Sequence, residues 1–177
     1  MVLLALAGVA VAVRYLRGCS IRAAIEAGDV ARVQQILARR PGLARASYDD
    51  GSSPLHLAAA RDATGIVELL IEAGAPVNQR DAFSGNTPLH IAAGSAGSAT
   101  IGLLLKNGAD PGARNHQGDC PLHLAADRGR VEVIRCFIQA EADLGVTDSL
   151  GRTPLRRAAE RGRAAAVRLL RSRAVQR

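Results

Sequence analysis

The chain has 177 residues, of which 48% are hydrophobic and 22% charged, and its formal net charge is +7. This length suits one domain or a short array of repeats, and the apolar content excludes intrinsic disorder. The three cysteines are odd in number, far apart and without a CxxC spacing, which argues against a disulfide framework or a cysteine zinc site. Because the chain has two Phe, two Tyr and no Trp, its core must consist mainly of Ala, Leu, Val and Ile.

The N-terminal segment, residues 1–18, opens with an apolar run that carries no charged side chain and is followed by Arg14 and Arg17. As a helix, this run would span about 20 Å, short of the roughly 30 Å hydrocarbon core of a membrane. We expect residues 1–16 to form a short membrane anchor, with the arginines behind it holding the rest of the chain on the cytoplasmic side. Two alternatives stay open: a helix packed on the domain that follows, and a secretory or lipoprotein signal for export.

From residue 51 onward the sequence repeats itself four times. Four prolines follow one another at intervals of 34, 33 and 33 residues, each with a glycine three positions earlier and an Ala-Ala pair shortly after it. Ser or Thr before proline predicts a helix start, because the hydroxyl caps a backbone N–H and proline presets the helical φ. A second apolar run at helical spacing predicts a second helix with one buried face. The motif residues are Ser53, Pro54, His56, Thr87, Pro88, His90, Pro121, His123, Thr153 and Pro154.

This period, with the pattern T-P-L-H-x-A, resembles the ankyrin repeat. The resemblance covers about residues 20–177 and implies an all-α solenoid of about five units, each built as helix, turn, helix and hairpin, behind the short apolar N-terminal helix. The first unit lacks the T-P-L-H pattern, as expected for a cap at the end of a stack. We expect the domain to cover residues 19–177, with units at 20–50, 51–84, 85–117, 118–150 and 151–177.

Some units depart from the pattern. Cys120 stands where other units have a hydroxyl cap, and Glu141 stands where two earlier units have glycine. Each change is expected to cost on the order of 1 kcal/mol, through lost capping or a strained φ. Arg156 replaces the motif histidine of the last unit, where no further repeat would meet it. Cys136 takes a position that leucine fills elsewhere, so we expect a buried apolar side chain.

The polar motif residues do not indicate catalysis. His56, His90 and His123 recur at equivalent positions, so they would lie about 8–10 Å apart on successive helices, too far for two of them to bind one zinc ion. We expect each ring to bond its own N-cap and a neighbouring backbone carbonyl instead. Ser53 beside His56 lacks an orienting acid, and the glycine-rich turn at 94–98 lacks the lysine of a phosphate-binding loop. We therefore expect no enzymatic activity, no metal and no cofactor.

The resemblance implies a binding module for a protein partner, and we expect the chain to be a monomer. Repeat stacks present a concave surface of hairpins and first helices, with specificity at positions outside the motif. Phe83 is the sharpest candidate, because its hairpin carries one extra residue and aromatic side chains dominate interface hot spots. Alternatively, its ring folds back onto its own hairpin. The candidate partner-binding residues are Tyr48, Asp50, Arg61, Arg80, Phe83, Arg114, His116, Asp119, Arg128, Leu150 and Arg152.

The last unit, residues 151–177, carries nine arginines against one acidic residue, Glu160, whereas residues 1–150 have a net charge of −1. We interpret this charge mainly as solvation of a terminal repeat, which needs a polar outer face. The alternative is a charge-driven binding site for an acidic protein, anionic lipid or nucleic acid. Nucleic acid is the least favoured of these, because no aromatic residue for base stacking lies nearby.

Overall fold

The computed structural model describes residues 20–174, which contain no strand and form ten α-helices and one 3-10 helix. The predicted all-α solenoid is confirmed. The anchor and its alternatives concern residues 1–18 and lie outside the described residues; no helix within residues 20–174 is long and apolar enough to cross a membrane. The elements are α2 (Ile21–Glu26), α3 (Val30–Arg39), η1 (Pro41–Arg45), α4 (Pro54–Ala60), α5 (Thr64–Glu72), α6 (Pro88–Ser95), α7 (Ser98–Lys106), α8 (Pro121–Arg128), α9 (Val131–Gln139), α10 (Pro154–Glu160) and α11 (Ala164–Ala174).

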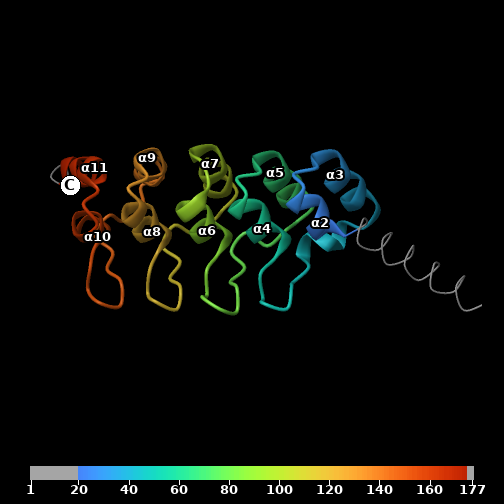
Figure 1. The fold of residues 1–177 in the computed structure, drawn as a ribbon, viewed down its shortest axis with the longest axis horizontal. Helices are drawn as coiled ribbons and strands as arrows, with labels where there is room; N and C mark the ends of the chain where they lie inside the picture. Colours follow the sequence, from blue (N-terminus) through green and yellow to red (C-terminus); the bar gives the residue numbers. More distant parts are fainter. Residues whose placement is uncertain (1–19, 175–177) are drawn as a thin grey trace, which may run out of the picture.

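The helices stand in two rows (Figure 1). One row contains the first helices of the units, α2, α4, α6, α8 and α10, and the other contains the second helices, α3, α5, α7, α9 and α11. The hairpins extend from the row of first helices. Neighbouring first helices pack more closely than neighbouring second helices, because small alanines are buried between them. The hairpins and the first helices lie on the same side of the stack, away from the second helices (Figure 1). We call the surface between the hairpins and the first helices the groove.

The Ala-Ala pairs show why the repeats stack. Both alanines are fully buried in α4, α6 and α8, since a unit lies on each side of these helices. In α10, Ala158 is buried whereas Ala159 is exposed, because no described unit follows it. The absence of a bulky side chain at these positions lets successive first helices approach closely and keeps the hairpins within hydrogen-bonding distance of one another.

The turns after the second helices confirm the predicted backbone strain. Gly74 and Gly108 end α5 and α7 with φ of +83°, in the left-handed region that favours glycine. Glu141 occupies the equivalent position after α9 with φ of +54°. A residue with a side chain is strained in this region, so the fourth unit has a less favourable turn than the two units before it.

The motif histidines form a ladder between units, as predicted. Nε2 of His56, His90 and His123 lies 3.0 Å from a backbone oxygen of the next unit, namely that of Asn86, Asp119 and Arg152. A carbonyl accepts, so Nε2 carries the proton and Nδ1 accepts from the backbone N–H of the N-cap residue. Burial lowers the pKa of all three rings and outweighs these carbonyl bonds, which act in the opposite direction.

The predicted departures have mixed outcomes. Cys120 keeps the geometry of the N-cap, because its Sγ lies 3.1 Å from His123 Nδ1, where a hydroxyl lies in the two preceding units. Arg156 is exposed and pairs with Glu160, as expected at the end of the stack. Cys136 is only half-buried, so the expectation of a buried side chain is wrong. The reason is its place at the edge of the second-helix row, where the equivalent leucines are also half-buried.

Candidate functional site

Four hairpins project beside the first helices, at residues 47–52, 80–86, 114–119 and 147–152, and we number them 1 to 4. A backbone hydrogen bond joins the two arms of each hairpin and shows which of their residues are equivalent. These bonds run from Tyr48 N to Ser52 O (2.8 Å), from Asp81 N to Asn86 O (2.8 Å), from Asn115 N to Asp119 O (2.9 Å) and from Asp148 N to Arg152 O (3.0 Å).

The hairpins are joined to one another at their tips. Gly51 shows how closely hairpins 1 and 2 approach: it has φ of +72°, and a Cβ at this position would lie 2.6 Å from Ala82 N. The tips therefore form one continuous row beside the first helices. Its links run from Ala82 N to Asp50 O (3.0 Å), from His116 N to Ser84 O (2.8 Å) and from Ser149 N to Gln117 O (3.3 Å).

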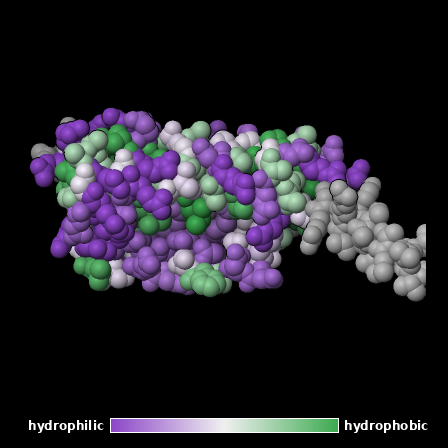
Figure 2. Space-filling view, in the orientation of Figure 1, coloured by the Kyte–Doolittle hydropathy of each residue, from purple (hydrophilic) through white to green (hydrophobic). Residues whose placement is uncertain are grey.

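Two of the predicted partner-binding residues are exposed hydrophobic side chains on this row. Phe83 in hairpin 2 is 88% exposed and Leu150 in hairpin 4 is 72% exposed. The alternative that the Phe83 ring folds back onto its hairpin is therefore wrong. Along the hairpin edge, Figure 2 shows hydrophobic surface at separate tips among hydrophilic side chains. Aromatic side chains are the more informative of the two kinds, because they are enriched in the hot spots of protein interfaces.

The extra residue of hairpin 2 explains the exposure of Phe83. In hairpin 1 the turn is closed from Gly51 N to Tyr48 O, across three residues, whereas in hairpin 2 it is closed from Gly85 N to Asp81 O, across four. Asp81 Oδ1 supports the wider turn by accepting hydrogen bonds from Ser84 N (2.6 Å) and Gly85 N (3.1 Å). The inserted residue thus lengthens the tip and carries the Phe83 ring away from the hairpin.

A cavity of about 360 Å³ lies in the groove between hairpins 1 and 2. Its size is within the range of small-ligand pockets. It brings together Tyr48, Asp50 and Phe83 from the predicted set, and we call it the Tyr48–Phe83 cavity. Its apolar floor comes from α4 and α6, and polar side chains of the two hairpins form its edge. The remaining lining residues are Arg22, Ser52, His56, Leu57, Ala60, Asp81, Ser84, Asn86 and Ile91.

Tyr48 is the residue that departs most from the hairpin pattern. Hairpins 2 to 4 have Asp or Asn at the equivalent position, and the side-chain oxygen accepts backbone N–H groups of the turn. Tyr48 cannot do this, and Asp50 Oδ1 takes over by accepting a hydrogen bond from Ser52 N (3.0 Å). The pattern is broken where the cavity lies, and departures of this kind are expected at functional sites.

The surroundings of Tyr48 are partly desolvated. Arg22 lies over its ring, with 5.0 Å between the guanidinium carbon and the ring centroid. The Tyr48 hydroxyl is buried and has no hydrogen-bond partner among the described residues. Burial raises the pKa of Tyr48 to about 12, although the charge of Arg22 acts in the opposite direction. The phenol therefore stays protonated at neutral pH and keeps an unused donor beside the cavity.

The remaining predicted residues do not join this cavity. Arg80 and Arg114 line a separate cavity of about 430 Å³ with Asp110. Arg61 Nη1 donates to Glu26 O (2.7 Å) and Arg128 Nη1 to Gly94 O (3.1 Å), so both tie their unit to the preceding one. His116 Nδ1 lies 3.2 Å from Phe83 O, which connects hairpins 2 and 3. Arg152, also in the predicted set, is part of a network at the far end of the groove.

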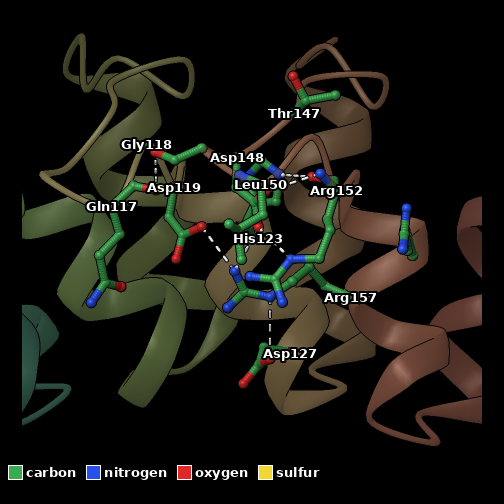
Figure 3. A network of polar contacts seen from close by, with 12 residues as sticks. Gln117, Gly118, Asp119, His123, Asp127, Thr147, Asp148, Leu150, Arg152 and Arg157 are labelled. Atoms are coloured by element: carbon green, nitrogen blue, oxygen red, sulfur yellow. Dashed lines mark hydrogen bonds and ion pairs between the residues drawn. The ribbon is translucent and has the colours of Figure 1, made fainter.

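Asp119 is a correction to the predicted set. It was expected at an exposed tip, but it is 1% exposed and its Oδ1 lies 2.9 Å from Arg157 Nη1. Arg157 also binds Asp148 Oδ2 (3.1 Å) and Asp127 Oδ1 (3.4 Å), and it lies at the centre of the network in Figure 3. The carboxylate of Asp119 points into the groove toward α10 because Arg157 attracts it, so it is not available at the tip.

Asp148 is the most strongly held acid of this network. Burial by itself would raise the pKa of its carboxyl, but hydrogen bonds from Arg152, Arg157 and Leu150 N outweigh burial and hold the pKa well below its usual range. Its Oδ1 accepts from the backbone of the turn, and its Oδ2 accepts from Arg152 Nε (2.9 Å) and Arg157. The carboxylate thus connects hairpin 4 to α10.

The network also changes the interpretation of the basic last unit. Acidic residues neutralise part of its charge: Arg161 pairs with Asp127 at 2.9 Å, and Arg156 pairs with Glu160. On α11, Arg168 and Arg171 have no carboxylate partner among the described residues. Part of the unpaired charge of the described residues is therefore on α11, the last second helix. Within residues 20–174 no cluster of side chains is suited to hold a metal ion.

Sequence reasoning missed two kinds of residue. Leu57 and Ile91 form the floor of the cavity, but they occupy the fourth position of the P-L-H-L motif and were treated as part of the repeat. Arg157 has the same position in the last unit and was counted as surface charge. An alignment of the units on their prolines contains the signal, because it puts an arginine where other units have an aliphatic residue.

Comparison with known families agrees with this geometry. The family model described as Ankyrin repeats (3 copies) matches residues 21–115 and again residues 95–176. The chain therefore belongs to the ankyrin-repeat family, whose members are generally protein–protein interaction modules and typically non-enzymatic scaffolds. In the comparison with curated proteins, no match was found.

Proposed function

We propose that this ankyrin-repeat domain binds a protein partner in the groove, with the Tyr48–Phe83 cavity as the main contact. The single observation that carries this proposal is the coincidence of two departures from the repeat pattern at one cavity. One is Tyr48 in place of the Asp or Asn of the other hairpins, and the other is the inserted residue that exposes Phe83. Each change carries a cost, because one leaves a buried hydroxyl without a partner among residues 20–174 and the other exposes an aromatic ring.

The rest of the groove suits an extended contact. Hydrogen bonds between the tips, and from the motif histidines to the next hairpin, hold the hairpins at fixed positions. A partner would therefore bind a preformed surface, and little of the binding free energy would be spent on ordering it. Leu150 provides a second exposed hydrophobic contact two hairpins further along. A partner that reaches both Phe83 and Leu150 would lie along the row of tips.

Site-specific photocrosslinking tests the proposal. A photoreactive benzoylphenylalanine replaces Phe83 in the full-length chain expressed in its native cells, and crosslinked species are detected by their mass. The control carries the same group at Glu68, an exposed position on α5 in the row of second helices. We expect a defined crosslinked protein from position 83 and none from position 68. Crosslinks from position 68 alone would place the binding surface on the other side of the stack.

A further inference from the structure

The repeat lets two places in the groove be compared atom by atom. Arg157 is the third residue after Pro154, and Ile91 is the third residue after Pro88, so both point from a first helix at the same position of their units. The three acids around Arg157 also have counterparts around Ile91. Asp148 corresponds to Asp81 by the bond that joins the arms of each hairpin, Asp119 corresponds to Ser52 and Asp127 corresponds to Ala60.

All the counterparts line the Tyr48–Phe83 cavity: Ile91, Asp81, Ser52 and Ala60. The cavity is therefore the place that Arg157 fills with its own side chain two units later. Ile91 is shorter than arginine, and Ser52 and Ala60 are smaller than aspartate, which leaves the volume of about 360 Å³ unfilled. The Arg157 guanidinium occupies this position at the C-terminal end of the groove, whereas the equivalent position at the N-terminal end is open.

Asp81 retains the carboxylate geometry with which Asp148 binds Arg157. Oδ1 of Asp148 accepts backbone N–H groups of its turn while Oδ2 binds Arg157. Oδ1 of Asp81 likewise accepts hydrogen bonds from Ser84 N and Gly85 N, whereas its Oδ2 accepts none within residues 20–174. One oxygen of Asp81 thus orients the carboxylate, and the oxygen that holds a guanidinium in hairpin 4 is unused.

The charge of the cavity is also negative on balance. Asp50 adds a second carboxylate, and its Oδ1 accepts hydrogen bonds from Ser52 N and Ser52 Oγ. The only cationic side chain in the lining, Arg22, is paired with Glu26 at 3.0 Å. An apolar side chain entering the cavity would desolvate the two aspartates without replacing the hydrogen bonds that they make to water.

The apolar part of the lining selects among cations. Leu57, Ala60 and Ile91 can pack against the methylene groups of a long side chain, whose charged end then reaches the edge of the cavity. Phe83 offers an aromatic face, and Arg22 on Tyr48 already shows a guanidinium over a ring at this site. A planar guanidinium stacks on rings and binds carboxylates with two parallel hydrogen bonds, whereas an ammonium does not.

We propose that the Tyr48–Phe83 cavity binds an arginine side chain of the partner, in the place that Arg157 occupies between hairpins 3 and 4. The guanidinium lies between Asp50 and Asp81, the Phe83 ring covers it, and the methylene groups contact Leu57 and Ile91. This inference rests on the proposed function, because it names the side chain that the groove takes from its protein partner.

An NMR titration of the full-length chain tests this proposal with N-acetyl-arginine amide as the probe. We expect amide shifts confined to Ser52, Ser84, Asn86 and their neighbours, with a dissociation constant in the millimolar range, as for a single side chain. N-acetyl-norleucine amide, with a similar stem but no charge, should bind at least five-fold more weakly. The lysine analogue should fall between them.

A matched pair of variants tests whether the negative charge of Asp81 binds the arginine probe. Asp81→Asn retains the oxygen that closes the turn but removes the negative charge, and should weaken arginine binding at least three-fold. Asp143→Asn is the control, because Asp143 Oδ1 also accepts a backbone N–H of its own turn, that of Gly145 (2.8 Å), and lies outside the cavity, so it should change nothing. Equal binding of the norleucine probe, or an equal effect of both variants, would overturn the proposal. If the arginine probe fails while Phe83 still crosslinks a protein, the inference falls and the proposed function stands.

Discussion

Arg157 fills the groove between hairpins 3 and 4, whereas between hairpins 1 and 2 the shorter Ile91 leaves the Tyr48–Phe83 cavity open. Both residues have the same helical position, the third after the motif proline, although hairpin 2 has one inserted residue that hairpin 4 lacks. At the C-terminal end the carboxylates of Asp119 and Asp148 are used internally to hold the last unit. At the N-terminal end the carboxylate of Asp81 remains available. If the proposed function holds, this repeat stack uses one position for stability in one unit and for binding in another.

The largest effect is expected from Arg157→Ala. The substitution leaves two buried carboxylates, those of Asp119 and Asp148, without their shared cation, and should lower the free energy of unfolding by about 3 kcal/mol. Arg156→Ala is the matched control, because Arg156 is 64% exposed, and should cost less than about 1 kcal/mol. Urea denaturation of both variants measures the difference. Equal losses would show that the network does not hold the last unit.

Phe83→Ala addresses the open end. Under the proposed function the ring is a main contact for the partner, and at 88% exposure it touches little of the domain itself. Affinity for the crosslinked partner should therefore fall about 30-fold, which corresponds to about 2 kcal/mol. The melting temperature should not change. Leu150→Ala is the comparison at the other end and should weaken binding less than about three-fold. Isothermal titration calorimetry decides, and a larger effect of Leu150→Ala would reverse the assignment of the main contact.

Acid should weaken the closed end through Asp148. The folded pKa of its carboxyl is lowered, so its contribution to stability is complete above the ordinary carboxyl pKa, about 4, and is lost as the pH falls through the folded value. The wild type and Asp148→Asn should therefore differ clearly in free energy of unfolding at pH 6 and converge as the pH is lowered. Urea denaturation at a series of pH values measures the gap. A gap that stays constant would contradict the assigned role of the charge.

The smallest effect concerns the turn after α9. Glu141→Gly relieves a side chain held at φ of +54° and should raise the free energy of unfolding by about 1 kcal/mol without changing partner binding. Gly108→Glu is the reverse change at the equivalent turn, where a Cβ would meet no atom within 4 Å, and should lower it by a similar amount. Thermal melts compare the two. Changes of the same sign would show that φ does not determine the cost.

The fold could be predicted from sequence because its determinants are local. Each N-cap, its proline and the histidine three residues after the cap lie within one helical turn, and their repetition gives the stack. Strain at Glu141 was likewise visible, since the neighbouring units carry glycine there. These inferences need only the spacing of residues within a unit and a comparison between units.

The site was less accessible, because its residues come from different units. Phe83 could be chosen from its hairpin alone. Leu57 and Ile91, which line the same cavity, could not, because they are aliphatic residues of the repeat motif and were therefore assigned to the core. The inserted residue in hairpin 2 hides the equivalence of Tyr48 and Asp81, which appears only when the hairpins are aligned by their backbone hydrogen bonds. Asp119 was misplaced for the opposite reason: its hairpin position suggested exposure, and only the distant Arg157 turns it inward.

The comparison of the two ends is tested most directly by Ile91→Arg, which supplies at the N-terminal end the side chain that closes the C-terminal end. Titration of this variant with N-acetyl-arginine amide, followed by NMR, is the decisive measurement. We expect the shifts at Ser52, Ser84 and Asn86 to disappear, because the chain's own guanidinium would reach Asp81, while the amides of the other units keep their positions. A folded variant that binds the probe as tightly as the wild type would contradict the equivalence of the two places.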